Sequence, residues 1–360
     1  MEVKEATSVG IRDRARSCEL PLQDPLIKTY PQHAYGLAVL QVQPAARDWL
    51  FTNYLHLTAC PVHDPDLHDK SGRRLRASYF VDFCTPDLQH CFMPWLSSQL
   101  LSQATMQDLQ ITLRDVLRAA VTSNYYVQVP INEFYVPQSS AYRKTSYPHP
   151  VLVYGFDDDR QIFNCVGFLA QSYGPVEIEY DAMEAAFEKV PGTYWRDPSL
   201  FIFKLAKHCD YWMDPAFMRS SLEEYLTGTN VMERTAHFAM PRRDSFFGFS
   251  VWNVLTTHID AIASQAADSR AQPMHLLYEH KLFMEKRIEF MRERNLLAGA
   301  AGQQLADQCA SVRQNFFVAR TSYLQMSALN RWNDAKKLIA ALDGIAGMEQ
   351  RLIEGLIDAI

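Results

Sequence analysis

Apolar and polar residues alternate differently in the two halves of the chain. Between residues 26 and 205, β-branched and aromatic residues gather in short runs bounded by Pro, Gly, Asp and Ser, which predicts strands mixed with helices. From residue 206 onward, apolar residues recur at helical spacing over long segments. We therefore expect an α+β fold with an N-terminal extension over 1–25, an α/β domain over 26–205 and an all-helical half over 206–360.

The individual elements follow from the same patterns. Strands are predicted at 79–83, 125–129, 151–156 and 161–168. The acidic run Asp157–Asp159 then forms a hairpin turn between the last two strands. A helix is predicted to begin at Thr105, because this capping threonine is followed three residues later by Asp108 and then by leucines at helical spacing. Further helices are predicted over 34–42, 215–226, 246–267, 274–297, 302–329 and 333–360.

Composition and charge narrow the functional classes. The 360 residues carry a formal net charge of −6, whereas a general nucleic-acid binder usually has a strong basic balance. No apolar run approaches the roughly 18 residues of a membrane span, and the charged N-terminal segment lacks the apolar core of a secretory signal. The seven cysteines show no CxxC spacing, which favours free thiols in a reducing compartment. We expect a cytoplasmic protein that binds neither nucleic acid nor membranes.

A histidine at the start of a strand is the main candidate for chemistry. The segment YPHPVLVYGFDDDRQIFNC (147–165) places His149 before an apolar run and Asn164 on the second strand of the hairpin. Such a hairpin suits a Cys–His–Asn/Asp site, in which an amide or carboxylate fixes the tautomer of the imidazole. A histidine that only packs beside a buried strand is the alternative. The chain has no P-loop and no GxGxxG motif, so no nucleotide cofactor is expected.

Two segments resemble a known family. VPINEFYVPQSSAYRKTSYPHPVLVYGFDDD (129–159) resembles the corresponding stretch of the butirosin-biosynthesis acyltransferase (BtrH-like) family, which belongs with the papain-type cysteine peptidases. YPQHAYGLAVLQ (30–41) is similar to that family's nucleophile segment, where a His-Cys pair opens the first helix. The resemblance covers roughly residues 25–190 and implies that the α/β domain is papain-like.

The resemblance also implies an activity. The chain would be an acyltransferase that moves an acyl or peptidyl group from a carrier-protein thioester to an amine acceptor in natural-product biosynthesis. It would hold no cofactor of its own, although phosphopantetheine on the partner carrier protein would present the acyl group. The alternatives are a thiol hydrolase or peptide-processing enzyme of the same fold, and a non-catalytic pseudoenzyme that binds the carrier protein.

The site implied by the resemblance lacks its nucleophile. His149 and Asn164 take the places of the catalytic histidine and its partner, but Ala34 follows His33 where the family has cysteine. Because alanine has no thiol, Ala34 marks an inactivated variant or a natural pseudoenzyme, unless another thiol serves. Cys60 is the alternative nucleophile, and its other interpretation is a plain buried thiol.

Four residues are assigned to substrate binding by the same resemblance, namely His33, Glu133, Tyr135 and Asp157. Glu133 and Tyr135 would line the acyl pocket, or they would pack as ordinary edge-strand residues. Asp157 would contact the substrate or only shape the hairpin turn. Two short basic patches (Arg73, Arg74 and Arg76; Arg242 and Arg243) would meet an acidic carrier protein or the phosphopantetheine phosphate, with solvated surface as the alternative.

Overall fold

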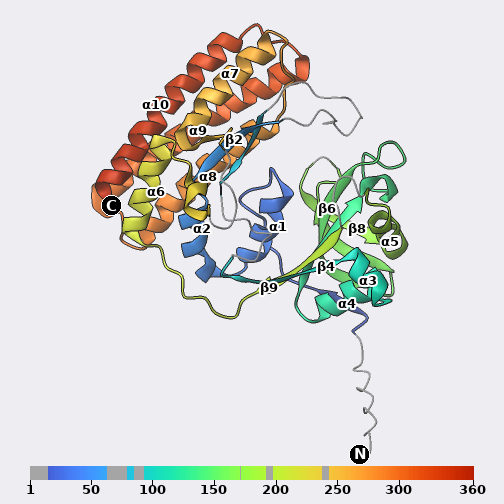
Figure 1. Cartoon of the computed structure of the whole chain (residues 1–360). Helices are drawn as coiled ribbons and strands as arrows, with labels where there is room; N and C mark the ends of the chain where they lie inside the picture. Colours follow the sequence, from blue (N-terminus) through green and yellow to red (C-terminus); the bar gives the residue numbers. More distant parts are fainter. Residues whose placement is uncertain (1–14, 63–78, 85–92, 171, 192–197, 237–242) are drawn as a thin grey trace, which may run out of the picture. The chain divides into compact units, whose positions relative to one another are not determined.

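The structure is a computed structural model that describes residues 15–62, 79–84, 93–170, 172–191, 198–236 and 243–360 (Figure 1). The chain forms two compact units. The first, called here the sheet unit, takes the chain up to Pro21 and Ser98–Lys204, and the second, the helical unit, takes Leu22–Ser97 and Leu205–Ile360. The expected boundary at 205–206 therefore lies at a passage between the units, whereas residues 26–97 group with the C-terminal helices.

The sheet unit contains, among the described residues, one sheet of seven strands. These are β1 (Ser17–Glu19), β4 (Leu96–Ser102), β5 (Tyr126–Asn132), β6 (Pro148–Asp157), β7 (Ile162–Gly167), β8 (Gly174–Glu179) and β9 (Ser199–Leu205). Their order is β4-β9-β5-β6-β7-β8, and the pairs that involve β5 to β8 are antiparallel. β6 is long enough to pair with β5 along its first half and with β1 along its second.

The predicted hairpin is confirmed. The expected strands at 125–129, 151–156 and 161–168 correspond to β5, β6 and β7. In the turn between β6 and β7, Asp157 Oδ1 accepts hydrogen bonds from the backbone N–H groups of Asp159 and Arg160. An aspartate that bonds the backbone two and three residues on fixes a tight turn, so Asp157 shapes the hairpin.

The helix predicted from Thr105 is in fact two helices. The helices of the sheet unit are α3 (Gln103–Asp108), α4 (Leu113–Thr122) and α5 (Tyr180–Glu188). Ser102 caps α3 by accepting a hydrogen bond from the Thr105 N–H. Between α3 and α4 the backbone of Gln110 turns left-handed, with φ of 54°, which ends a helix. Thr112 and Asp115 then form the three-residue capping pattern that the sequence predicts at Thr105.

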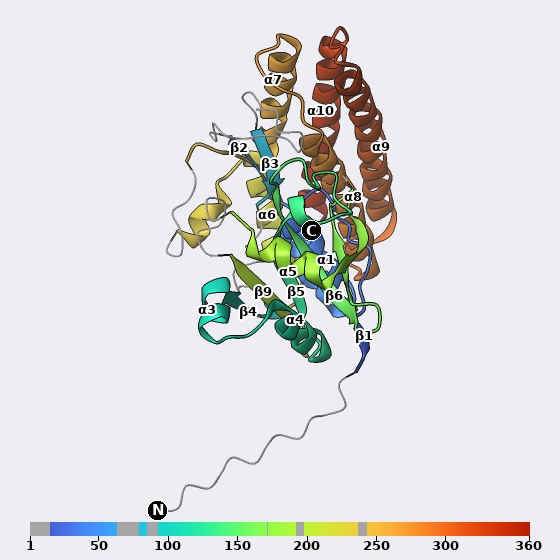
Figure 2. The same cartoon turned by 90° about the vertical axis from the view of Figure 1, so that its right-hand side faces the viewer.

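Two helices of the sheet unit pack against the same strand. α4 and α5 contact each other, and both contact β5; Figure 2 shows them beside the sheet. α5 also packs against the single turn η2 (Glu133–Tyr135), which follows β5 directly. The end of β5 is therefore supported from behind by a helix, which matters for the side chains described below.

The helical unit combines a small sheet with long helices. Its elements are α1 (Pro31–Leu40), η1 (Pro44–Ala46), α2 (Arg47–Asn53), β2 (Leu57–Pro61), β3 (Tyr79–Phe83), α6 (Pro215–Thr227), η3 (Val231–Thr235), β10 (Phe246–Phe247), η4 (Gly248–Ser250), α7 (Val251–Ala263), α8 (Gln272–Glu293), α9 (Gly299–Leu329) and α10 (Ala335–Ala359). The strand order is β10-β2-β3. α9 contacts both α8 and α10, and both views show α9 beside α10 (Figure 1 and Figure 2).

The long helical periods of the sequence are confirmed in α6, α8, α9 and α10. The helix predicted over 246–267 is shorter, because β10 and η4 precede α7. Gly248 explains the change of direction. Its φ is 53°, and a Cβ at this position would lie 2.3 Å from the carbonyl oxygen of Tyr225, so only glycine fits. The expected all-helical half therefore includes one short strand.

An ion pair is completely buried in the helical unit. Lys281 of α8 and Glu349 of α10 are each 1% exposed, and Lys281 Nζ lies 2.5 and 2.6 Å from the two carboxylate oxygens. The indole N–H of Trp252 and the hydroxyl of Tyr225 also donate to Glu349. Burial lowers the pKa of Lys281, and the facing Glu349 charge opposes this shift. One charged centre thus links α6, α7, α8 and α10.

Several expectations concern residues outside the described part of the chain. Residues 1–14 of the predicted extension, Cys91, and the basic residues Arg73, Arg74, Arg76 and Arg242 lie there. Arg243 is described and exposed, and β1 falls within the predicted extension. The six described cysteines are free. Among the described residues, none of the helices has both the length and the apolar character needed to cross a membrane.

Candidate functional site

The pairing of β5 with β6 brings a carboxylate next to His149. His149 lies opposite Ile131 of β5. Glu133 comes two residues after Ile131, at the start of η2, and diagonal neighbours on adjacent strands are within reach of long side chains. The backbone N–H of Glu133 donates to the carbonyl of Tyr147 at 2.9 Å, which holds the two chain segments together.

His149 and Glu133 form an imidazole–carboxylate pair. Nδ1 of His149 lies 3.3 Å from Oε1 of Glu133, close enough for an electrostatic contact but not aligned as a hydrogen bond. The Glu133 side chain is fully buried, whereas that of His149 is 18% exposed. The hydroxyl of Ser139 donates to the other carboxylate oxygen, Oε2, at 2.5 Å. A buried carboxylate needs such partners, because burial alone opposes its charge.

This arrangement suits His149 as a general base. A carboxylate beside Nδ1 favours a proton on that nitrogen, so Nε2 keeps its lone pair. An imidazole in this tautomer can take a proton from an incoming nucleophile. Contacts of this kind are often long in the free protein and tighten when a substrate binds, so 3.3 Å is compatible with the role.

Two aromatic rings flank the imidazole. The ring centroid of Tyr147 lies 5.9 Å from that of His149, and the ring of Phe168 lies edge to face with it at 5.7 Å. Phe168 in turn contacts Tyr173 at 5.5 Å. Apolar ring surface next to the pair lowers the local dielectric, which strengthens the attraction between Glu133 and a protonated His149.

Asn164, the expected partner of His149, lies elsewhere on the sheet. β7 pairs with β6 so that Asn164 is opposite Gly155. Gly155 is six residues beyond His149, which corresponds to about 20 Å along an extended strand. The structure therefore does not bring Asn164 to His149. Glu133, which we expected to line an acyl pocket, occupies the place of the orienting residue.

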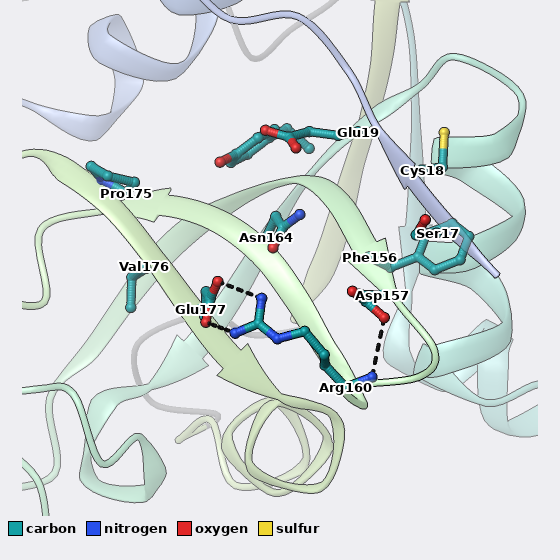
Figure 3. Close-up of a pocket in the computed structure, with 11 residues that line it drawn as sticks. Ser17, Cys18, Glu19, Phe156, Asp157, Arg160, Asn164, Pro175, Val176 and Glu177 are labelled. Atoms are coloured by element: carbon teal, nitrogen blue, oxygen red, sulfur yellow. Dashed lines mark hydrogen bonds and ion pairs between the residues drawn. The ribbon is translucent and has the colours of Figure 1, made fainter.

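Asn164 and Asp157 instead line a common pocket with a volume of about 640 Å³ (Figure 3). Strands β1, β6, β7 and β8 contribute its walls. Arg160 and Glu177 form a two-pronged ion pair in it, with N–O distances of 2.9 and 2.5 Å. Two of the expected site residues thus share a surface that is remote from His149 along β6.

The pocket depends on an irregularity in β6. The register between β6 and β7 shifts between Val153 and Gly155, as in a β-bulge. A Cβ at Gly155 would lie 2.9 Å from the carbonyl oxygen of Cys18 and 3.0 Å from Nδ2 of Asn164. Glycine is required here because β1 approaches the bulged strand so closely.

Tyr135 remains a packing residue in its described contacts. It lies at the end of η2 and is half-buried. Its ring meets Phe134 edge to face at a centroid distance of 5.0 Å. This agrees with the interpretation that the aromatic pair before Pro137 stabilises the strand end.

His33 and Ala34 lie in the first turn of α1, in the helical unit. Nε2 of His33 lies 2.6 Å from Asp82 Oδ1, and Nδ1 lies 3.4 Å from the Tyr54 hydroxyl. Both ring nitrogens are therefore engaged inside the protein, and the side chain is only 4% exposed. Ala34 is fully buried, and its backbone N–H and that of His33 both donate to the carbonyl of Tyr30. Neither N–H is available to an oxyanion.

Cys60 lies in β2 of the helical unit and is 5% exposed. Its sulfur accepts a hydrogen bond from the Ser245 hydroxyl at 3.1 Å and lies 3.6 Å from Thr58 Oγ1. These described contacts are hydroxyls and include no imidazole. They agree with the interpretation of Cys60 as a buried thiol.

Sequence reasoning identified Glu133 and His149 separately and did not pair them. Ser139 was not identified at all. The available signal was the spacing along two adjacent strands: Glu133 directly follows β5, and His149 is the second residue of β6, so the two residues flank the loop 134–147. Such a signal becomes readable only once the register of β5 and β6 is known.

Comparisons with known proteins add no assignment. No family model matches the chain, and no curated protein matches it. Within the described part of the chain, no group of three or more His, Cys, Asp and Glu side chains could hold a metal ion. What the site can do must therefore be derived from Glu133, His149 and their neighbours.

Proposed function

We propose that the chain is an acyltransferase that moves an acyl or peptidyl group from a carrier-protein thioester to an amine, with His149 as its general base. The observation that carries the proposal is the buried Glu133 carboxylate 3.3 Å from Nδ1 of His149. A carboxylate inside the protein next to a partly exposed imidazole is the arrangement that general-base catalysis uses. A histidine that only filled space would not need a buried charge behind it.

The transfer proceeds in one displacement. Nε2 of His149 takes a proton from the amine as the amine nitrogen attacks the thioester carbon. The C–N bond forms, the C–S bond breaks, and the imidazolium gives the proton to the leaving thiolate, so that an amide and a free thiol are the products. Glu133 stabilises the imidazolium between these two proton transfers. No acyl-enzyme forms at position 34, because Ala34 has no thiol.

The resemblance of 30–41 and 129–159 to the BtrH-like family supports the classes of donor and acceptor. A papain-like fold belongs to the same proposal. It is supported by an antiparallel sheet that carries His149 and by a helix, α1, whose first turn contains Ala34, the residue that the resemblance aligns with the family's cysteine. The acyl donor would be a phosphopantetheine thioester on a carrier protein.

The test incubates the full-length chain with acyl-pantetheine thioesters and a panel of primary amines. Thiol release and amide formation are followed separately, the second by mass spectrometry. We expect amide only when thioester and amine are both present, and a loss of about 100-fold or more in His149→Gln. The control is His208→Gln, because the side chain of His208 is 80% exposed.

Two outcomes would overturn the proposal. Thiol release that needs no amine would identify a thiol hydrolase of the same fold. Binding of an acyl carrier protein without thiol release would identify a non-catalytic binding protein.

A further inference from the structure

We infer that Ser139 is a positioning residue, whose hydroxyl fixes the Glu133 carboxylate and thereby sets the tautomer of His149. The inference concerns the site of the proposed function, and its catalytic consequence rests on that function. The effect of Ser139 on the tautomer does not rest on the proposed function, because the tautomer of an imidazole can be measured in the absence of any substrate.

The hydroxyl of Ser139 both accepts and donates a hydrogen bond. Ser139 is 6% exposed, and its Oγ accepts a hydrogen bond from the backbone N–H of Ala141 at 3.0 Å. Accepting from that N–H leaves the hydroxyl its own proton, which it donates to Glu133 Oε2 at 2.5 Å. The backbone N–H of Ser139 donates to the Val136 carbonyl at 3.0 Å, so the turn that carries the hydroxyl is itself fixed.

This hydrogen bond decides which way the carboxylate faces. Rotation about the last bond of a glutamate side chain is soft, so the plane of a carboxylate is set by its partners. With Oε2 held by Ser139, Oε1 is the oxygen that faces Nδ1 of His149. A hydrogen bond to the charged form also favours ionisation of a fully buried carboxyl group. If the Glu133 carboxyl group were neutral, it would no longer favour a proton on Nδ1 of His149.

The backbone of Glu133 is held by a different residue. The side chain of Asn132 donates to Ser146 Oγ and to the Lys189 carbonyl, and it accepts from the N–H groups of Phe134 and Tyr147. Asn132 thus joins the end of β5 to the start of β6 and to the end of α5. Removal of the Ser139 hydroxyl should therefore free the carboxylate and leave the strand ends in place.

The adjacent residue supplies a matched control. Ser140 has the same side chain in the same turn, and its Oγ is buried without a hydrogen-bond partner among the described residues. Ser140→Ala removes an identical hydroxyl whose contacts, within the described part of the chain, include no hydrogen bond. Any effect of Ser139→Ala that Ser140→Ala shares would come from the turn, and not from the contact with Glu133.

The experiment measures ¹⁵N chemical shifts of the imidazoles in the ¹⁵N-histidine-labelled full chain at pH 9, where an ordinary imidazole is neutral. His149→Gln assigns the signals. We expect His149 to carry its proton on Nδ1 in the natural chain, in Ser139→Thr and in Ser140→Ala. In Ser139→Ala we expect a mixture of the two tautomers, and in Ser139→Cys, whose thiol is a weak donor, an intermediate result.

Activity provides the second readout. If the proposed function holds, Ser139→Ala lowers kcat by about 10-fold, with KM little changed, and Ser139→Thr restores it. An unchanged His149 tautomer in Ser139→Ala, or an equal change in Ser140→Ala, would overturn the inference. If Ser139→Ala does not fold, Ser139→Cys decides between the same two outcomes. A tautomer that responds to Ser139 in a chain without transferase activity would sink the proposed function and leave the positioning role intact.

Discussion

Oε1 of Glu133 lies 3.3 Å from Nδ1 of His149, and none of the Glu133 side chain reaches solvent. The carboxylate belongs to a short turn after β5, and the imidazole belongs to β6, so the contact exists only because the two strands pair in one register. The first prediction therefore concerns the charge of Glu133.

Glu133→Gln keeps the shape of the side chain and removes its charge. We expect kcat for amide formation to fall by about 100-fold, because a neutral amide cannot stabilise the imidazolium of His149 by charge. Steady-state kinetics with a saturating amine check this. Glu177→Gln is the control, since Glu177 is an exposed partner of Arg160 and such pairs contribute little. Equal losses in both variants would contradict the assignment.

Ala34→Cys restores the residue that the resemblance leads one to expect. Because Ala34 is fully buried, we expect the new thiol to react with iodoacetamide more slowly than the half-buried Cys18 does. Peptide mapping after timed labelling measures both rates in one sample. Rapid, selective labelling of position 34 near neutral pH would instead favour a covalent mechanism and argue against the single displacement.

Glu349→Gln leaves Lys281 as a buried charge without its counter-charge. We expect the free energy of unfolding to fall by about 3–5 kcal/mol, and the double variant Lys281→Met/Glu349→Leu to recover most of the loss. Urea unfolding followed by circular dichroism measures both. The matched control is Asp334→Asn, which breaks the exposed pair with Lys337 and should cost less than about 0.5 kcal/mol. A Glu349→Gln chain as stable as this control would refute the prediction.

His56 should make the protein less stable in acid. Burial, together with the charges of Arg234 and Arg287, lowers the pKa of His56 to about 3, and Glu224 at 3.9 Å is the facing carboxylate. As the pH falls from about 6.5 towards 3, the unfolded chain binds a proton that the folded chain does not. The free energy of unfolding then falls by about 1.4 kcal/mol per pH unit through this group alone.

The measurement compares the slope of unfolding free energy against pH, between pH 7 and pH 4.5, in the natural chain and in His56→Gln. We expect the slope in His56→Gln to be smaller by about 1.4 kcal/mol per pH unit, the contribution of one proton, whatever the stability of the variant at pH 7. His208→Gln should keep the natural slope because His208 is exposed. Identical slopes in all three chains would mean that His56 titrates normally.

Gly155→Ala should disturb the pairing of β6 with β1. The added methyl group would meet the Cys18 carbonyl oxygen at 2.9 Å, so β1 has to move, and we expect a loss of about 1–3 kcal/mol. Gly174→Ala in the same sheet is the control, because nothing lies within 4 Å of the added atom. Hydrogen exchange of the Cys18 and Leu20 amides should rise only in Gly155→Ala.

The sequence predicts an element well where the residues of that element alone carry the pattern. The long apolar periods of α6, α9 and α10 were recognisable because a packed helix repeats its buried face over many turns. The break between α3 and α4 was not, since a single left-handed residue, Gln110, interrupts an otherwise continuous pattern. The capping signal at Thr112 was the correct clue, and the similar spacing at Thr105 concealed it.

The site was predicted only in part, for a reason of register. The acidic turn at Asp157–Asp159 obliges Asn164 to face Gly155, so a residue as far from the turn as His149 has no partner in β7 near Asn164. His149 and Asn164 are fifteen residues apart in the sequence, but only the position of the turn determines which residue of β6 lies opposite Asn164. Glu133 reaches His149 from the other neighbouring strand, and no local pattern marks that contact.

The helical unit is discontinuous in sequence, which sets an order of events during translation. When residue 205 leaves the ribosome, all the described strands of the sheet unit have been made, whereas β10 and α6–α10 have not. Domains generally fold as units during synthesis. The Phe51 ring therefore lacks its partners Phe283 and Phe290 until α8 has been made. A translational pause between 205 and 283 would leave a complete set of sheet strands joined to a segment whose helical partners have not yet been made.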